Sequence, residues 1–171
     1  MQKALEMGKK SATGSFQLFV GVAASTIIMA VGTIILARLI KPEEYGLYAI
    51  ALIPSYTAVL FRDWGVNNAV ARYIASLRAK NREGEAYDII VSGMFFELAT
   101  GFALSLILVS LSGFIASTVF QRPEVSSLIA VASTTVFAGA LLTVVQSSFI
   151  GFERMELNSL TNICQALAKT V

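Results

Sequence analysis

Long runs without a charged residue constrain this chain more than any other feature. Residues 11–37, 45–61 and 125–152 contain no charged side chain, and residues 89–121 contain only one, Glu97. A membrane-crossing helix needs about 20 mainly apolar residues, whereas a membrane barrel would show segments of about ten residues with alternating polarity. The runs do not alternate. They predict an all-α fold, a polytopic membrane helix bundle with four complete transmembrane helices and the start of a fifth.

The composition agrees with a membrane helix bundle and limits the catalytic and metal-binding chemistry that the chain can perform. Hydrophobic residues make up 56% of the chain and charged residues 14%, compared with about 45–50% and 25% in soluble domains. The chain has no histidine, the commonest metal ligand and general base. It contains no P-loop, zinc-ligand spacing or serine-nucleophile motif. We therefore expect no enzyme, no cofactor and no metal, and we expect membrane lipids rather than nucleic acid as partners.

Prolines and charges divide the chain into segments. We expect a cytoplasmic tail at residues 1–15 and a transmembrane domain at 16–171. Pro42 and Pro123 are each followed by acidic residues, which is typical of a helix start. The expected helices span about 16–40, 45–65, 87–111, 125–152 and, incompletely, 157–171. A cytoplasmic amphipathic segment, 66–86, places Val70, Tyr73, Ile74 and Leu77 on one helical face, either on the membrane surface or as an extension of the preceding helix.

The basic residues predict the orientation. Loops on the side of the amino terminus hold nine Lys and Arg residues, and loops on the other side hold three. Because short cytoplasmic loops are enriched in Lys and Arg, we expect a multi-pass protein of the cell membrane with a cytoplasmic amino terminus.

Glu97 lies on a stripe of small and polar residues. Gly93, Glu97, Gly101 and Ser105 follow one another at four-residue steps. Glu97 is about 15 Å along its helix from residue 87, near the bilayer centre, where an acidic group is costly. Two interpretations follow: the glycines allow close helix packing with Glu97 protonated or locally bonded, or Glu97 faces a functional cavity.

Two further polar faces occur downstream. One face of the helix at 125–152 carries Thr135, Thr143 and Gln146. The last segment carries Asn158, Asn162, Gln165 and Lys169 at steps of four, three and four residues. Since Lys169 reaches a depth similar to that of Glu97, we hypothesise that the two pair or share a ligand; alternatively each faces the cavity separately, or Lys169 ends a soluble amphipathic helix.

The end of the second helix offers another candidate site. Arg62 and Asp63 lie there, and Arg72 follows in the amphipathic segment. Arg62 and Asp63 either pair with each other or bind anionic lipid or a substrate phosphate, and Arg72 is a further phosphate or lipid-headgroup candidate. The five basic residues between 62 and 82 are also explained by the cytoplasmic enrichment alone.

Several segments resemble one family. Residues 36–48 read Leu-Ala-Arg-Leu-Ile-Lys-Pro-Glu-Glu-Tyr-Gly-Leu-Tyr and resemble the first helical hairpin of the polysaccharide-biosynthesis, or oligosaccharide flippase, family of the multidrug/oligosaccharidyl-lipid/polysaccharide exporter superfamily. Asp63-Trp64-Gly65-Val66 resembles its Asp-Leu-Gly-Leu motif, with Trp64 as a departure. Residues 71–75, Ala-Arg-Tyr-Ile-Ala, resemble its basic amphipathic stretch, and residues 151–154, Gly-Phe-Glu-Arg, its turn after the fourth helix.

The resemblance implies a function. Such proteins have two lobes of helices around a central cavity and move polyprenyl-linked glycans across the membrane by alternating access. The chain looks like a fragment of the amino-terminal lobe, whose partner would be the missing carboxy-terminal lobe. Glycan headgroups would contact the hydroxyl and amide faces, and pyrophosphate would contact Arg62, Arg72 or Lys169. The alternatives are a cation-coupled multidrug antiporter, with Glu97 as the coupling acid, and a non-transporting four-helix membrane scaffold; a membrane-bound transferase is more distant.

Overall fold

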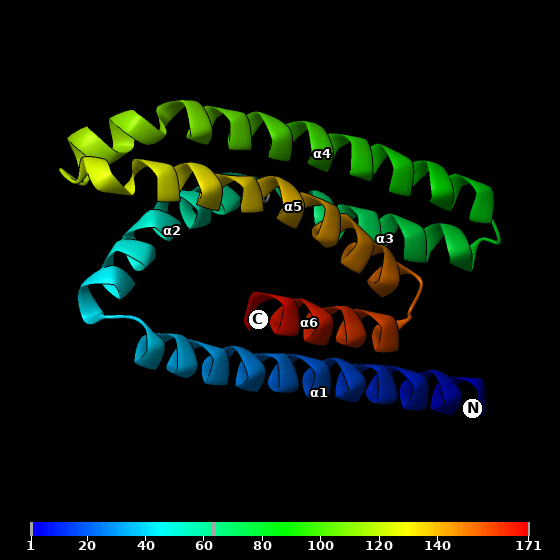
Figure 1. Cartoon of the computed structure of the whole chain (residues 1–171). Helices are drawn as coiled ribbons and strands as arrows, with labels where there is room; N and C mark the ends of the chain where they lie inside the picture. The colour runs from blue at the N-terminus through cyan, green and yellow to red at the C-terminus, as the bar shows by residue number, and fades with distance from the viewer. Residues whose placement is uncertain (1, 63, 171) are drawn as a thin grey trace.

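The structure is a computed structural model that describes residues 2–62 and 64–170, with side chains from residue 12 onward. Every regular element in the described residues is helical. A π-helical stretch, Ile115–Val119, continues α4, and a 3₁₀ turn, Pro123–Val125, leads into α5. The helices are α1 (Gln2–Leu39), α2 (Pro42–Arg62), α3 (Val66–Ala79), α4 (Glu83–Phe114), α5 (Ser126–Gly151) and α6 (Met155–Thr170) (Figure 1).

Among the described residues, four helices are long and apolar enough to cross a membrane. These segments are Ala12–Leu39, Pro42–Arg62, Glu83–Val119 and Pro123–Gly151. The prediction of an all-α, multi-pass helical bundle is thereby confirmed.

Some helices are longer than the sequence suggested. Residues 2–15, expected as a tail, belong to α1, because residues 2–10 are mostly good helix formers and no proline interrupts them. Helix α4, which corresponds to the helix expected at 87–111, begins at Glu83, with Glu83 and Glu85 in its first turn, where acidic side chains offset the helix dipole.

The helices pack in two groups (Figure 1). Helices α4 and α5 lie along each other, with α2 and α3 packed against both, whereas α1 lies along α6. Glycines set the close approaches. A Cβ atom added at Gly101 would lie 2.7 Å from the Cβ of Ala140, and one added at Gly93 would lie 2.7 Å from Cγ2 of Val70. The glycines of the α4 stripe therefore serve helix packing, as the first interpretation predicts.

A break separates α2 from α3. The break contains Gly65, whose φ of 80° lies in the left-handed region, and the indole N–H of Trp64 donates to the carbonyl of Phe61. Beyond it, α3 lies along α4 and α5 in continuation of α2 (Figure 1), which favours an extension of α2. Val70 and Ile74 are buried.

One residue predicted on the apolar face of the segment 66–86 points away from the buried residues of that face. Tyr73, expected on the same helical face as Val70 and Ile74, is 59% exposed. The reason is geometric: its side chain points roughly a quarter-turn away from the direction shared by Val70 and Ile74, because successive residues rotate by about 100°.

Candidate functional site

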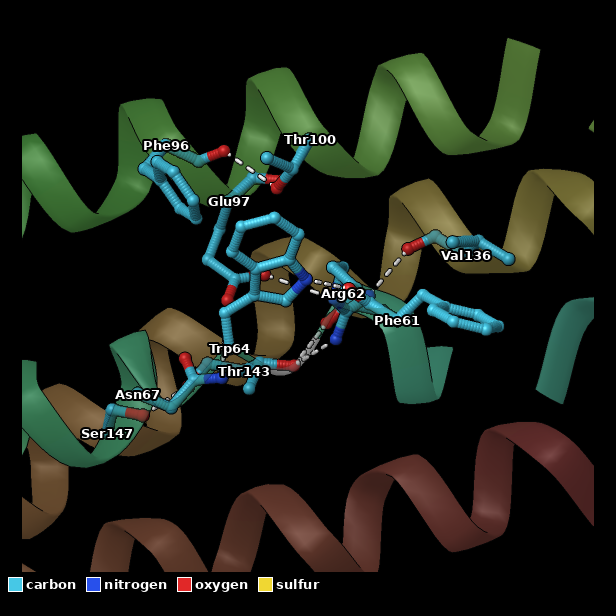
Figure 2. Close-up of polar contacts among 11 residues, drawn as sticks. Phe61, Arg62, Trp64, Asn67, Phe96, Glu97, Thr100, Val136, Thr143 and Ser147 are labelled. Atoms are coloured by element: carbon cyan, nitrogen blue, oxygen red, sulfur yellow. Dashed lines mark hydrogen bonds and ion pairs between the residues drawn. The ribbon is translucent and has the colours of Figure 1, made fainter. Parts of the chain in front are cut away.

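A buried ion pair lies where α2 meets the middle of α4. The Nε atom of Arg62 is 3.1 Å from Oε2 of Glu97, and the side chains are 5% and 0% exposed. Arg62 is the last residue of α2, and Glu97 lies on the face of α4 that packs into the bundle (Figure 2). Glu97 therefore faces the bundle interior, as its stripe predicts.

The rest of the Arg62 guanidinium bonds to α5. Nη1 donates to the carbonyl of Val136 at 2.8 Å, and Nη2 donates to the hydroxyl of Thr143 at 2.9 Å. A Cβ atom at Gly139 would lie 3.4 Å from Nη1, so the glycine leaves room for the guanidinium. A buried charge is tolerated when it is both paired and hydrogen-bonded, and these contacts supply both conditions.

Both oxygens of the Glu97 carboxylate are in contact with residues that flank the α2–α3 break. Arg62, just before the break, contacts Oε2. The side-chain amide of Asn67, just after it, donates to Oε1 at 3.2 Å (Figure 2). We call Arg62, Asn67, Glu97 and Thr143 the Glu97 cluster. It joins four helices, α2, α3, α4 and α5.

Sequence reasoning missed Asn67. A signal was present, because Asn67 stands three residues before Val70 and seven before Ile74, and this spacing puts all three on one helical face. A polar residue at the end of a buried apolar stripe therefore indicated an interior partner.

The Glu97 cluster corrects the expectation for Arg62. The sequence placed Arg62 at the cytoplasmic end of its helix, available to a phosphate, but its guanidinium is held by protein partners at Val136 and Thr143. Val136 and Thr143 lie in the middle of the uncharged run 125–152. The sequence does not reveal that the middle of this run packs beside the end of α2. Asp63, predicted beside Arg62, lies outside the described residues.

The hypothesis that Glu97 pairs with Lys169 is wrong. Lys169 is exposed in the last turn of α6, while Glu97 pairs with Arg62. The reason lies in the packing: α6 lies along α1, whereas α4 lies against α2, α3 and α5.

A second polar group joins α5 to α6. Nε2 of Gln146 donates to Oδ1 of Asn162 at 2.8 Å, and Nδ2 of Asn162 donates to Oδ1 of Asn158 at 3.1 Å. Nδ2 of Asn158 donates in turn to the carbonyl of Gln146 at 3.4 Å. We call these three residues the amide cluster. The two polar faces predicted from the sequence therefore meet each other, one turn of α5 away from Thr143.

The remaining candidates lie outside both clusters. Thr135 is exposed, and its hydroxyl donates to the carbonyl of Ala132 at 2.6 Å. Gln165 is half-buried on α6, and Arg72 is exposed on α3. The structure thus brings together two groups of the predicted polar residues and leaves Thr135, Gln165, Lys169 and Arg72 apart from them.

A helical bundle with four membrane-spanning helices and polar clusters between those helices defines a multi-pass membrane protein with a polar interior. The family model of the polysaccharide biosynthesis proteins matches residues 11–171, and the chain belongs to that family. Searches of the curated proteins and of the solved structures each found no match. The family and the four apolar helices fit a membrane transporter in general.

Proposed function

We propose that the protein takes part in moving lipid-linked oligosaccharide or polysaccharide precursors across the cell membrane, as a flippase. The observation that supports this proposal best is the amide cluster between α5 and α6, in a chain that belongs to the polysaccharide biosynthesis family. Gln146 of this cluster lies in the candidate membrane span Pro123–Gly151, and polar groups inside such spans are costly and usually mark a substrate pathway.

The amide cluster has the chemistry that a glycan requires. Side-chain amides and hydroxyls both donate and accept hydrogen bonds, as sugar hydroxyls do. When a sugar binds, hydrogen bonds from its hydroxyls would replace the amide-to-amide hydrogen bonds among Gln146, Asn158 and Asn162. The net free-energy cost would be small, because each hydrogen bond that is lost is replaced by another. Thr135 and Gln165 lie apart from this cluster and would offer a sugar further hydroxyl and amide contacts, whereas the Thr143 hydroxyl already accepts a hydrogen bond from Arg62.

The pyrophosphate of a polyprenyl-linked substrate needs a cationic side chain near the residues that bind the sugar. Arg62 is engaged by Glu97, Val136 and Thr143, and releasing it would leave the Glu97 carboxylate buried without its cation. Lys169 lies on α6, the helix that carries Asn158, Asn162 and Gln165, and it is exposed. We therefore assign the pyrophosphate to Lys169.

We also propose that the amino terminus is cytoplasmic, from the distribution of Lys and Arg.

The antiporter alternative is less well supported. It requires Glu97 to take up a transported cation. The Arg62 guanidinium already lies 3.1 Å from one oxygen of that carboxylate, and the amide of Asn67 donates to the other. An incoming cation would have to displace the guanidinium inside an apolar bundle.

Transport of a labelled lipid tests the proposal. The protein, as its gene encodes it, is reconstituted into vesicles that contain a polyprenyl-pyrophosphate sugar with a fluorophore on the sugar. A membrane-impermeant reductant then quenches the outward-facing label. We expect the protein to make the inward-facing label accessible, and Asn162→Ala to slow this step about tenfold, the order of one or two lost hydrogen bonds in a dry site.

Thr134→Ala is the matched control. Thr134 is exposed on α5 and its hydroxyl donates only to its own helix, at the carbonyl of Val131, so this variant should transport normally. Label protection equal to that of protein-free vesicles would refute the flippase. An equal rate for Asn162→Ala and the parent would remove the amide cluster from the pathway.

A further inference from the structure

Helices α1 and α6 form a tightly packed pair. A Cβ atom added at Gly21 would clash with the side chain of Ser159, and one added at Gly32 would clash with the side chain of Thr170. The hydroxyl of Ser159 also donates to the carbonyl of Gln17 at 2.7 Å. Since surfaces packed this closely do not slide or separate without losing many contacts at once, α1 and α6 are held together as one unit.

The α1–α6 pair has little apolar contact with the other helices. In the part of the chain that the structure describes, α1 packs closely only on α6 (Figure 1). The buried hydrophobic clusters centre on Ala51 and Ile129 and on Val70 and Ile74, and neither cluster includes a residue of α1 or α6. The amide cluster joins α6 to α5. A junction with few buried apolar contacts opens at a lower free-energy cost than the core of a bundle does.

The end of α5 belongs to the other group of helices. A Cβ atom added at Gly151 would lie 2.7 Å from the Cβ of Ile74 on α3. The ring centroid of Phe152 lies 6.5 Å from that of Tyr87 on α4 and 5.4 Å from the guanidinium of Arg78 on α3. The chain is therefore fixed on α3 and α4 as far as Phe152.

Two short breaks connect the α1–α6 pair to helices α2–α5. Helix α6 begins at Met155, whose Cγ would lie 3.1 Å from a Cβ atom at Gly14 of α1. Residues 153–154 thus lie between the part fixed on α3 and α4 and the part fixed on α1, and Glu153 has a left-handed φ of 57°. Residues 40–41 are the break between α1 and α2. In hinge movements a few residues at the ends of helices take up the backbone rotation.

We propose that α1 and α6 turn as one unit against α2–α5 about residues 40–41 and 153–154, and that this movement opens and closes the amide cluster. The structure shows the closed state, in which Gln146 donates to Asn162 at 2.8 Å and Asn158 donates to the carbonyl of Gln146 at 3.4 Å. Opening breaks both of these contacts between α5 and α6. The freed amides then bond to water or to another hydroxyl compound, because amides both donate and accept hydrogen bonds.

The movement follows from the packing of the described helices and needs no second lobe. Its use, the admission of a sugar to the freed amides, rests on the proposed function. The two can fail separately, because the movement is measured as a distance and the flippase as lipid transport.

Distances between spin labels measure the movement. One label is attached to Cys164, which is exposed on α6, and the second to Thr134→Cys on α5 or to Ile27→Cys on α1, both at exposed positions. The protein, as its gene encodes it, is placed in lipid nanodiscs, and the distances are obtained by double electron–electron resonance. We expect two distances between α6 and α5, and one narrow distance between α6 and α1.

Asn162→Ala should favour the open state. It removes the bond from Gln146, so the ratio of the longer to the shorter α5–α6 distance should rise about tenfold, the order of one or two lost hydrogen bonds. The α1–α6 distance should not change. Gln146→Ala removes the same bond from the α5 side, should act alike, and covers the case in which Asn162→Ala folds poorly.

Thr161→Ala is the matched control. The hydroxyl of Thr161 donates to the carbonyl of Leu157 in its own helix, so this variant should show the distances of the parent. A single α5–α6 distance that is the same in the parent and in both amide variants would overturn the proposal. So would an α1–α6 distance that spreads together with the α5–α6 distance, because the two helices would then not move as one unit. Movement in a protein that transports no glycan would refute only the flippase.

Discussion

The Nε atom of Arg62 lies 3.1 Å from Oε2 of Glu97, and this buried contact ties the end of α2 to the middle of α4. The same carboxylate accepts a hydrogen bond from Asn67 at the start of α3. Glu97 thus contacts both residues that flank the α2–α3 break. These contacts hold the end of α2 and the start of α3 against the same point of α4.

Removing one partner of this pair should be costly. Arg62→Gln and Glu97→Gln should each lower the free energy of unfolding by about 3–5 kcal/mol, because each leaves a buried charge without its counter-charge. The double variant should cost less than the sum of the two, since it removes both charges. Unfolding by denaturant in detergent micelles measures all three. Arg122→Gln, which breaks only an exposed contact, should change the stability by about 0–1 kcal/mol. Additive losses would contradict the pairing.

Gly101 should not tolerate a methyl group. A Cβ atom there would lie 2.7 Å from the Cβ of Ala140, so Gly101→Ala should push α4 and α5 apart and destabilise the protein by about 1–3 kcal/mol. Gly46→Ala is the control, because Gly46 lies in a helix and a Cβ atom there meets nothing within 4 Å. That variant should be neutral or stabilising by up to about 1 kcal/mol. Thermal unfolding distinguishes the two, and equal midpoints would rule out the close approach.

Gly65→Ala tests whether the α2–α3 break needs the left-handed backbone conformation of Gly65. Gly65 has a φ of 80°, and a Cβ atom there would meet no neighbour within 4 Å. Any loss of stability must therefore come from the left-handed conformation, which costs an L-residue about 1–2 kcal/mol. Gly84→Ala, also without a neighbour but without a positive φ, should show no such loss. If both substitutions behave alike in a chemical denaturation series, Gly65 is not needed for the break.

Cysteine accessibility tests the orientation. In a background in which Cys164 is replaced by serine, a cysteine at Pro42 should react with a membrane-impermeant maleimide in intact cells, and a cysteine at Arg82 should not. The expectation follows from the excess of Lys and Arg on the side of the amino terminus. A permeant maleimide should label both positions and serves as the control. Labelling at position 82 and protection at position 42 would reverse the topology.

The sequence by itself predicted which segments are helices and which residues share a face. The uncharged runs predicted four membrane-spanning helices, and the four-residue steps of Gly93, Glu97 and Gly101 put these residues on one packed side of α4. Both predictions rest on local geometry. A helix repeats every 3.6 residues wherever it lies, so spacing along the chain is enough to define a stripe and to show that it is polar.

Only the tertiary structure decided which stripes meet. Counting residues along the helices gave similar depths for Glu97 and Lys169, and from these depths we hypothesised that the two pair. In the structure Glu97 contacts Arg62, while Lys169 remains exposed. Side-chain spacing carries no information about the order of helices in space. That order is set by which surfaces fit closely, such as Gly101 against Ala140 and Gly93 against Val70, because interhelical contact depends on shape over many residues at once.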